Sequence, residues 1–253
     1  MNLAIDAGNS RVKWGWHDGA RWTALATVSL VEFAAASHDV NPFAATHEDP
    51  ERIVISNVAG EGAHQLLVNW TSIFEAVPLW LTGEAARCGV RSRYERPEQL
   101  GPDRWAALVA ARALHTGACL VVNAGTATTV DRLSADGEFT GGVILPGVEL
   151  MRFVLHEHTG RLPIQEGRLR EAPRNTADAI ETGCRHAQAG TVERMFRAMG
   201  GNPLCIVSGG NGRQLIELLT LACRYVENLV LDGLGLIALD ERARESSRAL
   251  RSG

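Results

Sequence analysis

The feature that most constrains the fold is a short pattern that occurs twice. Residues 4–10 read AIDAGNS and residues 121–127 read VVNAGTA, so that in each an apolar run meets Asp or Asn and then Ala-Gly. Residues 53–57 (IVISN) and 205–209 (CIVSG) form a second matching pair, in the same order along the chain. Two matches in one order predict two similar lobes, each with a glycine turn after its first strand, that face a shared cleft.

Alternating apolar runs and helical patterns predict a mixed α/β chain. Gly and Asp-Gly turns at 18–19 and 136–137 indicate antiparallel hairpins beside the parallel pairing expected of an α/β fold. The polar segment 95–102, which contains two prolines, is the best candidate for a hinge. Strands are expected at 2–6, 12–17, 52–57, 119–123, 142–145, 204–208 and 229–232, and helices at 62–74, 104–115, 177–200, 212–221 and 234–250.

Composition argues against several classes of partner. The formal net charge of the 253 residues is −4, whereas nucleic-acid and membrane-surface binding favour a positive balance. The five cysteines are scattered and form no C-x-x-C pair, which indicates reduced thiols. The start of the chain lacks a basic segment typical of a signal peptide, and no apolar run approaches the length of a membrane span. A cytoplasmic location is therefore expected.

The first glycine turn joins a carboxylate to a basic residue over a short distance. Gly8 permits a tight turn whose backbone N–H groups can approach an anion, and Asn9 and Ser10 add side-chain donors. Lys13 supplies a charge suited to phosphate, while Asp6 would repel phosphate unless a divalent cation lay between them. A plain hairpin, in which Asp6 and Asn9 satisfy the turn backbone, is the competing interpretation.

Three further segments carry possible chemistry. The threonines of residues 123–129 could surround a polyphosphate, although a run of Thr is also ordinary strand sequence. In Gly101-Pro102-Asp103-Arg104, Asp103 is either a helix cap or a general base for phosphoryl transfer, and on its own the cap is favoured. The adjacent glycines of residues 207–212 permit a flat ring such as adenine to approach the backbone, or only form a loop.

Taken in order, these segments resemble the type III pantothenate kinases, which belong to the superfamily of acetate and sugar kinases, heat-shock ATPases and actin. The resemblance spans nearly the whole chain, and its motifs are specific in combination although none is specific alone. They are residues 6–13, Tyr94 with 97–104, 123–129, 141–147 and Asn175-Thr176.

The resemblance implies an α/β fold of two RNase H-like lobes, over residues 1–116 and 117–253, with ATP in the cleft between them. It also implies a homodimer and the first step of coenzyme A synthesis, in which ATP and pantothenate give ADP and 4′-phosphopantothenate. It assigns ATP phosphates and Mg²⁺ to Asp6, Ala7, Gly8, Asn9, Ser10, Arg11, Val12 and Lys13, with Thr126 as a further ATP contact. It makes Asp103 the catalytic base, and it assigns pantothenate binding to Tyr94, Gly101, Pro102, Asp103, Arg104 and Thr176.

One position departs from the family pattern. Many members carry an aspartate where this chain has Asn123, and that aspartate helps to hold a monovalent cation. Asn keeps a carbonyl oxygen but loses the charge, so a weakened requirement for K⁺ or NH₄⁺ is expected.

Three other functions compete with pantothenate phosphorylation. Relatives of the family are described as accessory factors for transcription activation, but the net charge of −4 and the lack of a basic helix argue against direct DNA contact. A sugar kinase of the same superfamily would share the phosphate-binding turns. A chaperone ATPase would need a peptide-binding domain for which the chain is too short.

Overall fold

The computed structural model describes residues 1–35, 43, 49–159 and 166–252, and the chain forms two compact units. Unit 1 consists of Met1–Leu114 together with the segment that begins at Leu229, and unit 2 consists of His115–Asn228. No helix in the described part of the chain is both long enough and apolar enough to cross a membrane.

Unit 1 is built on a five-stranded sheet of order β3-β2-β1-β4-β5. The first three strands in the chain pair antiparallel, and β1, β4 and β5 pair parallel. The strands are β1 (Asn2–Ala7), β2 (Arg11–His17), β3 (Trp22–Ser29), β4 (Arg52–Asn57) and β5 (Pro78–Trp80). A short hairpin, β6 (Ala86–Arg87) and β7 (Val90–Ser92), and the 3₁₀ turn η1 (Pro97–Gln99) complete its smaller elements.

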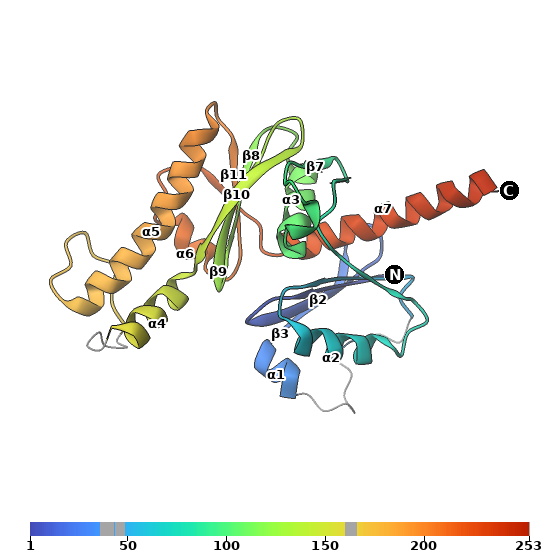
Figure 1. Ribbon diagram of the computed structural model, residues 1–253, viewed down its shortest axis with the longest axis horizontal. Coiled ribbons are helices and arrows are strands. Elements are labelled where there is room, and N and C mark those ends of the chain that lie inside the picture. The colour runs from blue at the N-terminus through green and yellow to red at the C-terminus, as the bar shows by residue number, and fades with distance from the viewer. Residues whose placement is uncertain (36–42, 44–48, 160–165, 253) are drawn as a thin grey trace. The chain divides into compact units, whose positions relative to one another are not determined.

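Helices cover both faces of the unit 1 sheet (Figure 1). The helices α1 (Leu30–Ala35) and α2 (Glu61–Thr71) pack on the face that carries Leu3, Ile5 and Ile55. The helices α3 (Pro102–Leu114) and α7 (Leu229–Ser252) pack against each other and against the opposite face of β1 and β4. Because side chains alternate along a strand, the even-numbered residues of β1 and β4 point toward α3 and α7.

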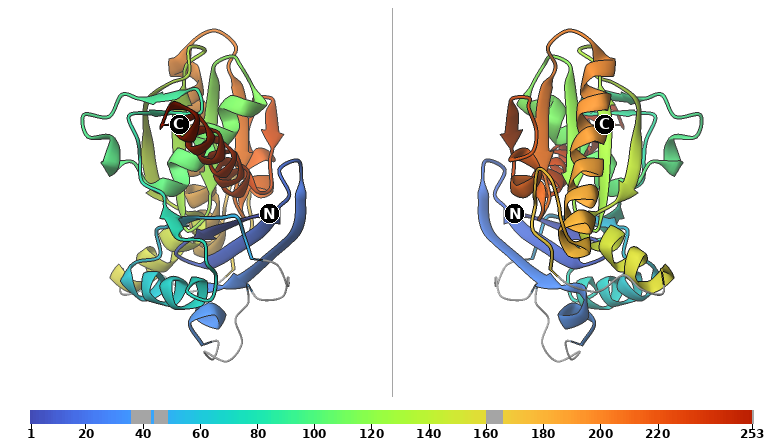
Figure 2. Two further views of the ribbon diagram at one scale, coloured as in Figure 1. Left: turned by 90° about the vertical axis from the view of Figure 1, so that its right-hand side faces the viewer. Right: turned by 90° about the vertical axis from the view of Figure 1, so that its left-hand side faces the viewer.

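Unit 2 contains a sheet in which the strand order is β12-β11-β8-β9-β10. These strands are β8 (Cys119–Ala124), β9 (Ala127–Leu133), β10 (Glu138–Pro146), β11 (Leu204–Ser208) and β12 (Cys223–Tyr225). The long helix α5 (Thr176–Met199) lies across one face, where Ala189 and Val192 join the apolar core (Figure 2, right). The remaining helices are α4 (Val148–His158) and α6 (Gly212–Ile216).

The two units repeat one topology, which confirms the prediction of two similar lobes. In unit 1, β1 pairs antiparallel with β2 and parallel with β4, and in unit 2, β8 pairs antiparallel with β9 and parallel with β11. The outer strands β3 and β5 of unit 1 correspond to β10 and β12 of unit 2. β1 and β8 even share one pattern of burial along their six residues.

The structure differs from expectation near the C-terminal end. The predicted strand at 229–232 is wrong, because these residues form the first turn of α7. The expected second lobe ran to residue 253, whereas α7 packs on α3 and belongs to unit 1. The chain leaves unit 1 after Leu114 and returns at Leu229, so the segment 95–102 lies within unit 1 rather than between the units.

Candidate active site

Asp6 lies near the carboxyl end of β1 and faces the α3 side of the unit 1 sheet. In the sheet register, Asp6 is paired with Lys13 on the antiparallel strand β2 and with Ser56 on the parallel strand β4. Residues in register on neighbouring strands project from the same face, so these three side chains form one short row. Oδ1 of Asp6 is buried and makes no hydrogen bond within the described structure.

Asp103 lies in the first turn of α3, where the backbone begins its helical hydrogen bonds. The N–H of Trp105 donates to the carbonyl of Gly101 at 2.9 Å. A Cβ atom on residue 101 would lie 2.7 Å from Oδ1 of Asp103, so any other residue there would force this carboxylate to shift. The positive end of the helix dipole favours a negative charge at this position.

Asp6 and Asp103 are both carboxylates with raised pKa values, and the charge of Asp103 contributes to the shift of Asp6. Burial, and after it the charge of Asp103, raises the pKa of Asp6 to about 7, while Lys13 and the hydroxyl of Ser56 act in the opposite direction. Burial also raises the pKa of Asp103, against the lowering effect of the Arg104 backbone and guanidinium. The structure therefore brings together two carboxylates whose charged forms are both disfavoured, an arrangement typical of functional sites.

The first glycine turn leaves its polar side chains exposed. The N–H of Gly8 donates to the carbonyl of Arg11 at 3.0 Å and closes the turn, and Asn9, Ser10 and Arg11 lie at the surface. Ala7 and Val12, which flank the turn, are buried in the core of unit 1. A ligand at this turn would meet those two residues through their backbone atoms only.

Tyr94 and Arg104, both expected to bind substrate, lie together in unit 1. A guanidinium nitrogen of Arg104 donates to the Tyr94 hydroxyl at 3.3 Å, and its central carbon lies 5.9 Å from the centre of the Tyr94 ring. Arg104 is only 5% exposed although it carries a charge. Gly101 and Pro102 directly precede Asp103 in the chain, and Arg104 directly follows it, so the predicted substrate residues of unit 1 cluster around Asp103.

The second glycine turn places Asn123 and Thr126 in unit 2. Asn123 occupies on β8 the position that Asp6 has on β1, between Thr129 of β9 and Ser208 of β11. Thr126 is exposed, and its carbonyl accepts from the N–H of Gly147 at 2.8 Å. The glycine at 147, part of a motif of the resemblance, thus braces the turn.

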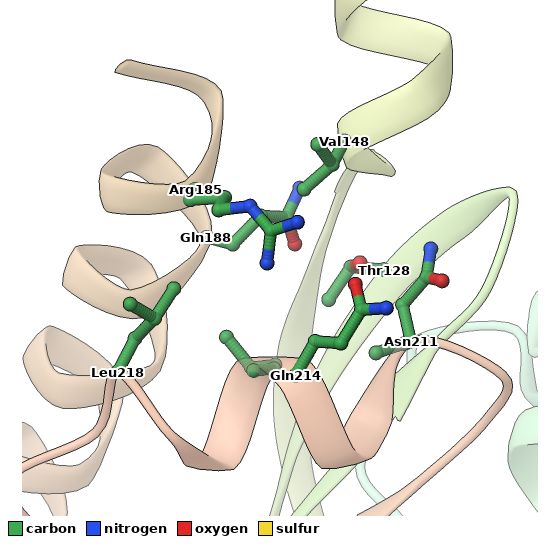
Figure 3. Close-up of a pocket in the computed structure, with 9 residues that line it drawn as sticks. Thr128, Val148, Arg185, Gln188, Asn211, Gln214 and Leu218 are labelled. Atoms are coloured by element: carbon green, nitrogen blue, oxygen red, sulfur yellow. The ribbon is translucent and has the colours of Figure 1, made fainter. Parts of the chain in front are cut away.

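A small pocket, lined by both polar and apolar side chains, lies beside the second turn (Figure 3). Its volume is about 20 Å³, which is enough for one water molecule. The amide nitrogen of Gln188 donates to the carbonyl of Pro146, so the amide oxygen points away from that carbonyl, buried and without a hydrogen bond in the described structure. The lining residues are Ala124, Thr128, Val148, Arg185, Gln188, Asn211, Gln214, Leu215 and Leu218.

Sequence reasoning missed the polar side chains that α5 and α6 contribute to this pocket, because no local motif marks them. It did identify the glycine pair after β11. Gly209 has a φ of +93°, and a Cβ there would lie 2.4 Å from the carbonyl oxygen of Ala124, so packing alone requires this glycine. Gly210 faces open space, so it leaves one face of the loop uncovered.

Thr176 is the first residue of α5. The side chain of Asn175 caps the helix by accepting from the N–H of Asp178 at 2.9 Å. Thr176 borders an apolar groove of about 610 Å³ between α4 and α5. The other lining residues are Pro146, Met151, Val154, Leu155, Ala179, Ile180, Gly183, Cys184 and Ala187.

Solved structures of low sequence identity share the fold. One is described as a Baf family transcriptional activator from Campylobacter jejuni, with a TM-score of 0.64, 22% identity and coverage of 95% of this chain and 99% of that one. Another is described as a 2-dehydro-3-deoxygalactonokinase from Sinorhizobium meliloti, with a TM-score of 0.61, 16% identity and coverage of 94% and 98%. These similarities confirm the expected α/β fold of two RNase H-like lobes, the actin-like ATPase fold, and say nothing of the substrate.

Sequence comparison identifies the family. The family model described as type III pantothenate kinase matches residues 2–198. A type III pantothenate kinase of Aromatoleum aromaticum is 51% identical over 245 residues, which cover 96% of this chain and all of that protein. The type III pantothenate kinase of Nitrosospira multiformis is 45% identical, over an alignment that covers 99% of this chain and 94% of that protein. The chain belongs to the type III pantothenate kinases, the enzymes that phosphorylate pantothenate in coenzyme A biosynthesis.

Proposed function

We propose that the chain transfers the γ-phosphoryl group of ATP to the hydroxyl of pantothenate at a site built around Asp6 and Asp103. The observation that supports this most directly is the pair itself: two buried carboxylates from distant parts of the sequence, of which Asp103 lies close enough to Asp6 for its charge to raise the pKa of Asp6. Phosphoryl transfer needs little covalent help, so catalysis rests on positioning, charge neutralisation and a proton acceptor.

Asp103 is the proton acceptor in this proposal. The attacking hydroxyl of pantothenate gives its proton to the Asp103 carboxylate as its oxygen bonds to the γ-phosphorus and the bond from phosphorus to the β,γ-bridging oxygen breaks. Burial raises the pKa of Asp103 and so makes the carboxylate a better base than an exposed aspartate. Gly101 supports this role, because a side chain there would collide with the carboxylate.

The turn from Asp6 to Lys13 binds the phosphates and a divalent cation. Asn9, Ser10 and Arg11 offer exposed donors, Lys13 offers a positive charge, and the backbone of Ala7, Gly8 and Val12 completes the turn. When bound, Mg²⁺ would neutralise phosphate charge.

The residues present fit Mg²⁺ on electrostatic grounds. Burial and repulsion by Asp103 disfavour the ionised form of Asp6, and the positive charge of a cation beside it would offset both effects. The described residues contain no cluster of three or more His, Cys, Asp or Glu that could hold a metal. Mg²⁺ commonly binds through one or two carboxylates, with waters and substrate phosphates as its other ligands, so a single carboxylate at the turn suffices.

Pantothenate binds, in this proposal, at the cluster of Tyr94, Gly101, Pro102 and Arg104. The buried guanidinium of Arg104, held by the Tyr94 hydroxyl, is suited to the substrate carboxylate, because guanidinium and carboxylate groups match in geometry. Thr176 is proposed as a further contact from the start of α5.

Unit 2 contributes Thr126 to ATP and Asn123 to a monovalent cation. Asn123 lies between Thr129 and Ser208, so its neighbours in the sheet are neutral hydroxyl residues. A neutral ligand set binds K⁺ or NH₄⁺ more weakly than one with a carboxylate. We therefore expect turnover in sodium-only buffer to stay close to that in potassium buffer, and a strong, saturable potassium dependence would contradict this.

A second copy of the chain is the proposed occupant of the groove between α4 and α5. The groove is apolar, and Phe153 and Val154 of α4 are 53% and 43% exposed. Exposed apolar side chains beside such a groove are typical of an interface between subunits.

We also propose a cytoplasmic location. The cytoplasm supplies ATP, and its reducing environment suits the five thiols, none of which forms a disulfide.

The substrate assignment is tested by measuring ADP release with pantothenate, a panel of sugars, or acetate, each with and without Mg²⁺. We expect turnover with pantothenate that depends on Mg²⁺. Turnover with another acceptor but not with pantothenate would overturn the assignment.

A further inference from the structure

Ser56 is a polar residue in a place that strands usually fill with apolar side chains. It follows Ile53, Val54 and Ile55 in β4, and it is fully buried. Its hydroxyl oxygen makes no hydrogen bond of regular geometry in the described structure. Because a buried hydroxyl without a hydrogen bond is unfavourable, this serine needs a reason for its presence.

The position of Ser56 supplies that reason. It is the register partner of Asp6 on the neighbouring parallel strand, and both residues are the fifth of their six-residue strands. Their side chains project from the same face, and Oδ1 of Asp6 is also buried without a hydrogen bond. A buried donor and a buried acceptor thus lie on adjacent residues, and a rotation about the serine side chain can join them.

The repeat of the fold offers an internal comparison. In unit 2, Ser208 on β11 is the register partner of Asn123 on β8, which matches the placement of Ser56 beside Asp6. Ser208 is also buried, at 3% exposure. Ser56 is paired with a carboxylate, whereas Ser208 is paired with the neutral Asn123. Comparing substitutions at the two serines therefore distinguishes an effect on the carboxylate from the general effect of removing a buried strand serine.

We propose that Ser56 is a positioning residue for Asp6: its hydroxyl donates a hydrogen bond to Oδ1 of the Asp6 carboxylate and so directs the other oxygen, Oδ2, toward the divalent cation bound with the nucleotide. This inference rests on the proposed role of Asp6. The hydrogen bond also adds a neutral donor where Asp103 brings a second negative charge close to Asp6. Residues that orient metal ligands in this way typically change metal affinity about 10- to 100-fold when they are removed.

The test compares Ser56→Ala with Ser208→Ala by metal binding. Mn²⁺ replaces Mg²⁺ as a paramagnetic probe, and the Kd of Mn²⁺ is measured by electron paramagnetic resonance with ADP present. We expect Ser56→Ala to weaken Mn²⁺ binding about 10-fold or more, and Ser208→Ala to change it by less than about 2-fold. Equal effects of the two substitutions, or no effect of Ser56→Ala, would overturn the proposal.

Two further measurements separate positioning from a merely structural role. Without metal or nucleotide, Ser56→Ala should still fold and unfold cooperatively, because the substitution removes no more than one hydrogen bond. A Ser56→Ala variant that is unfolded in that state would assign Ser56 to folding and overturn the proposal. Asp6→Asn should abolish Mn²⁺ binding. If Mn²⁺ binding survives Asp6→Asn, the metal role proposed for Asp6 fails. If only Ser56→Ala is without effect, the proposed function stands and this inference alone fails.

Discussion

At the scale of single residues, Asp6 is a carboxylate of the site with a raised pKa, and its ionisation is unfavourable in the folded chain. Its pKa of about 7 lies well above the usual value of 3.8, chiefly because the carboxylate is buried and secondarily because Asp103 repels it. Between these two values the folded chain retains a proton that the unfolded chain has lost. The free energy of unfolding therefore falls as the pH rises through this window, and the loss is complete above the folded pKa.

Replacing Asp6 by Asn should remove this pH dependence. Relative to wild type, Asp6→Asn should gain stability as the pH is raised from about 5 to about 8, by an amount on the order of 1–3 kcal/mol. Urea unfolding at both pH values, without metal or nucleotide, measures the change. A stability difference between the two proteins that is the same at both pH values would contradict the raised pKa.

Residue types alone predicted part of this site. The carboxylate, the glycine turn and Lys13 were visible as a local pattern, and the register of β1 and β2 places Lys13 beside Asp6 as that pattern required. Ser56 was not predicted, because its role depends on β4 pairing parallel with β1, a contact between residues about fifty positions apart. The burial of Arg104 and the small pocket beside Thr128 depend in the same way on tertiary packing.

At the scale of elements, α7 shows where local sequence is least informative. Residues 229–232 are a short apolar run, and such a run fits a buried strand as well as a buried helix. The close approach of α7 to α3 decides in favour of the helix. A Cβ on Gly233 would lie 1.9 Å from the carbonyl oxygen of Ala106, so the two helix backbones are nearly in contact at this glycine.

This contact predicts opposite effects for one substitution at two helix positions. Gly233→Ala should destabilise the chain by about 1–3 kcal/mol or more, because the added methyl forces α3 and α7 apart. Gly190→Ala, within α5 and with no neighbour to a Cβ, should stabilise it by up to about 1 kcal/mol. Thermal unfolding of the two variants measures both effects. A Gly233→Ala variant as stable as wild type would show that the helices do not pack this closely.

At the scale of the whole molecule, the fold was largely predictable because it is repeated. Matching turns and strands in the two halves of the sequence correspond to matching sheets in the two units. The return of the chain to unit 1 at Leu229 was not predictable, since nothing in the repeat shows where the last helix packs.

The proposed dimer is also a property of the whole molecule. Val154→Asp places a charge at the groove between α4 and α5 and should shift the chain from dimer to monomer in sedimentation experiments. Val77→Asp is the matched control, because Val77 belongs to unit 1, is 87% exposed and is not one of the residues that line this groove. Equal sedimentation of Val154→Asp and wild type would exclude the groove as the interface.

The most direct test of the central claim is the turnover of Asp103→Asn with ATP, Mg²⁺ and pantothenate. Asn keeps the size of the side chain but cannot accept the hydroxyl proton as a carboxylate does. We expect the variant to fold like wild type, as judged by circular dichroism and thermal unfolding, and to lose about 100-fold or more in kcat. Near-normal turnover in a folded Asp103→Asn protein would remove Asp103 from the mechanism and with it the carboxylate pair as the centre of the site.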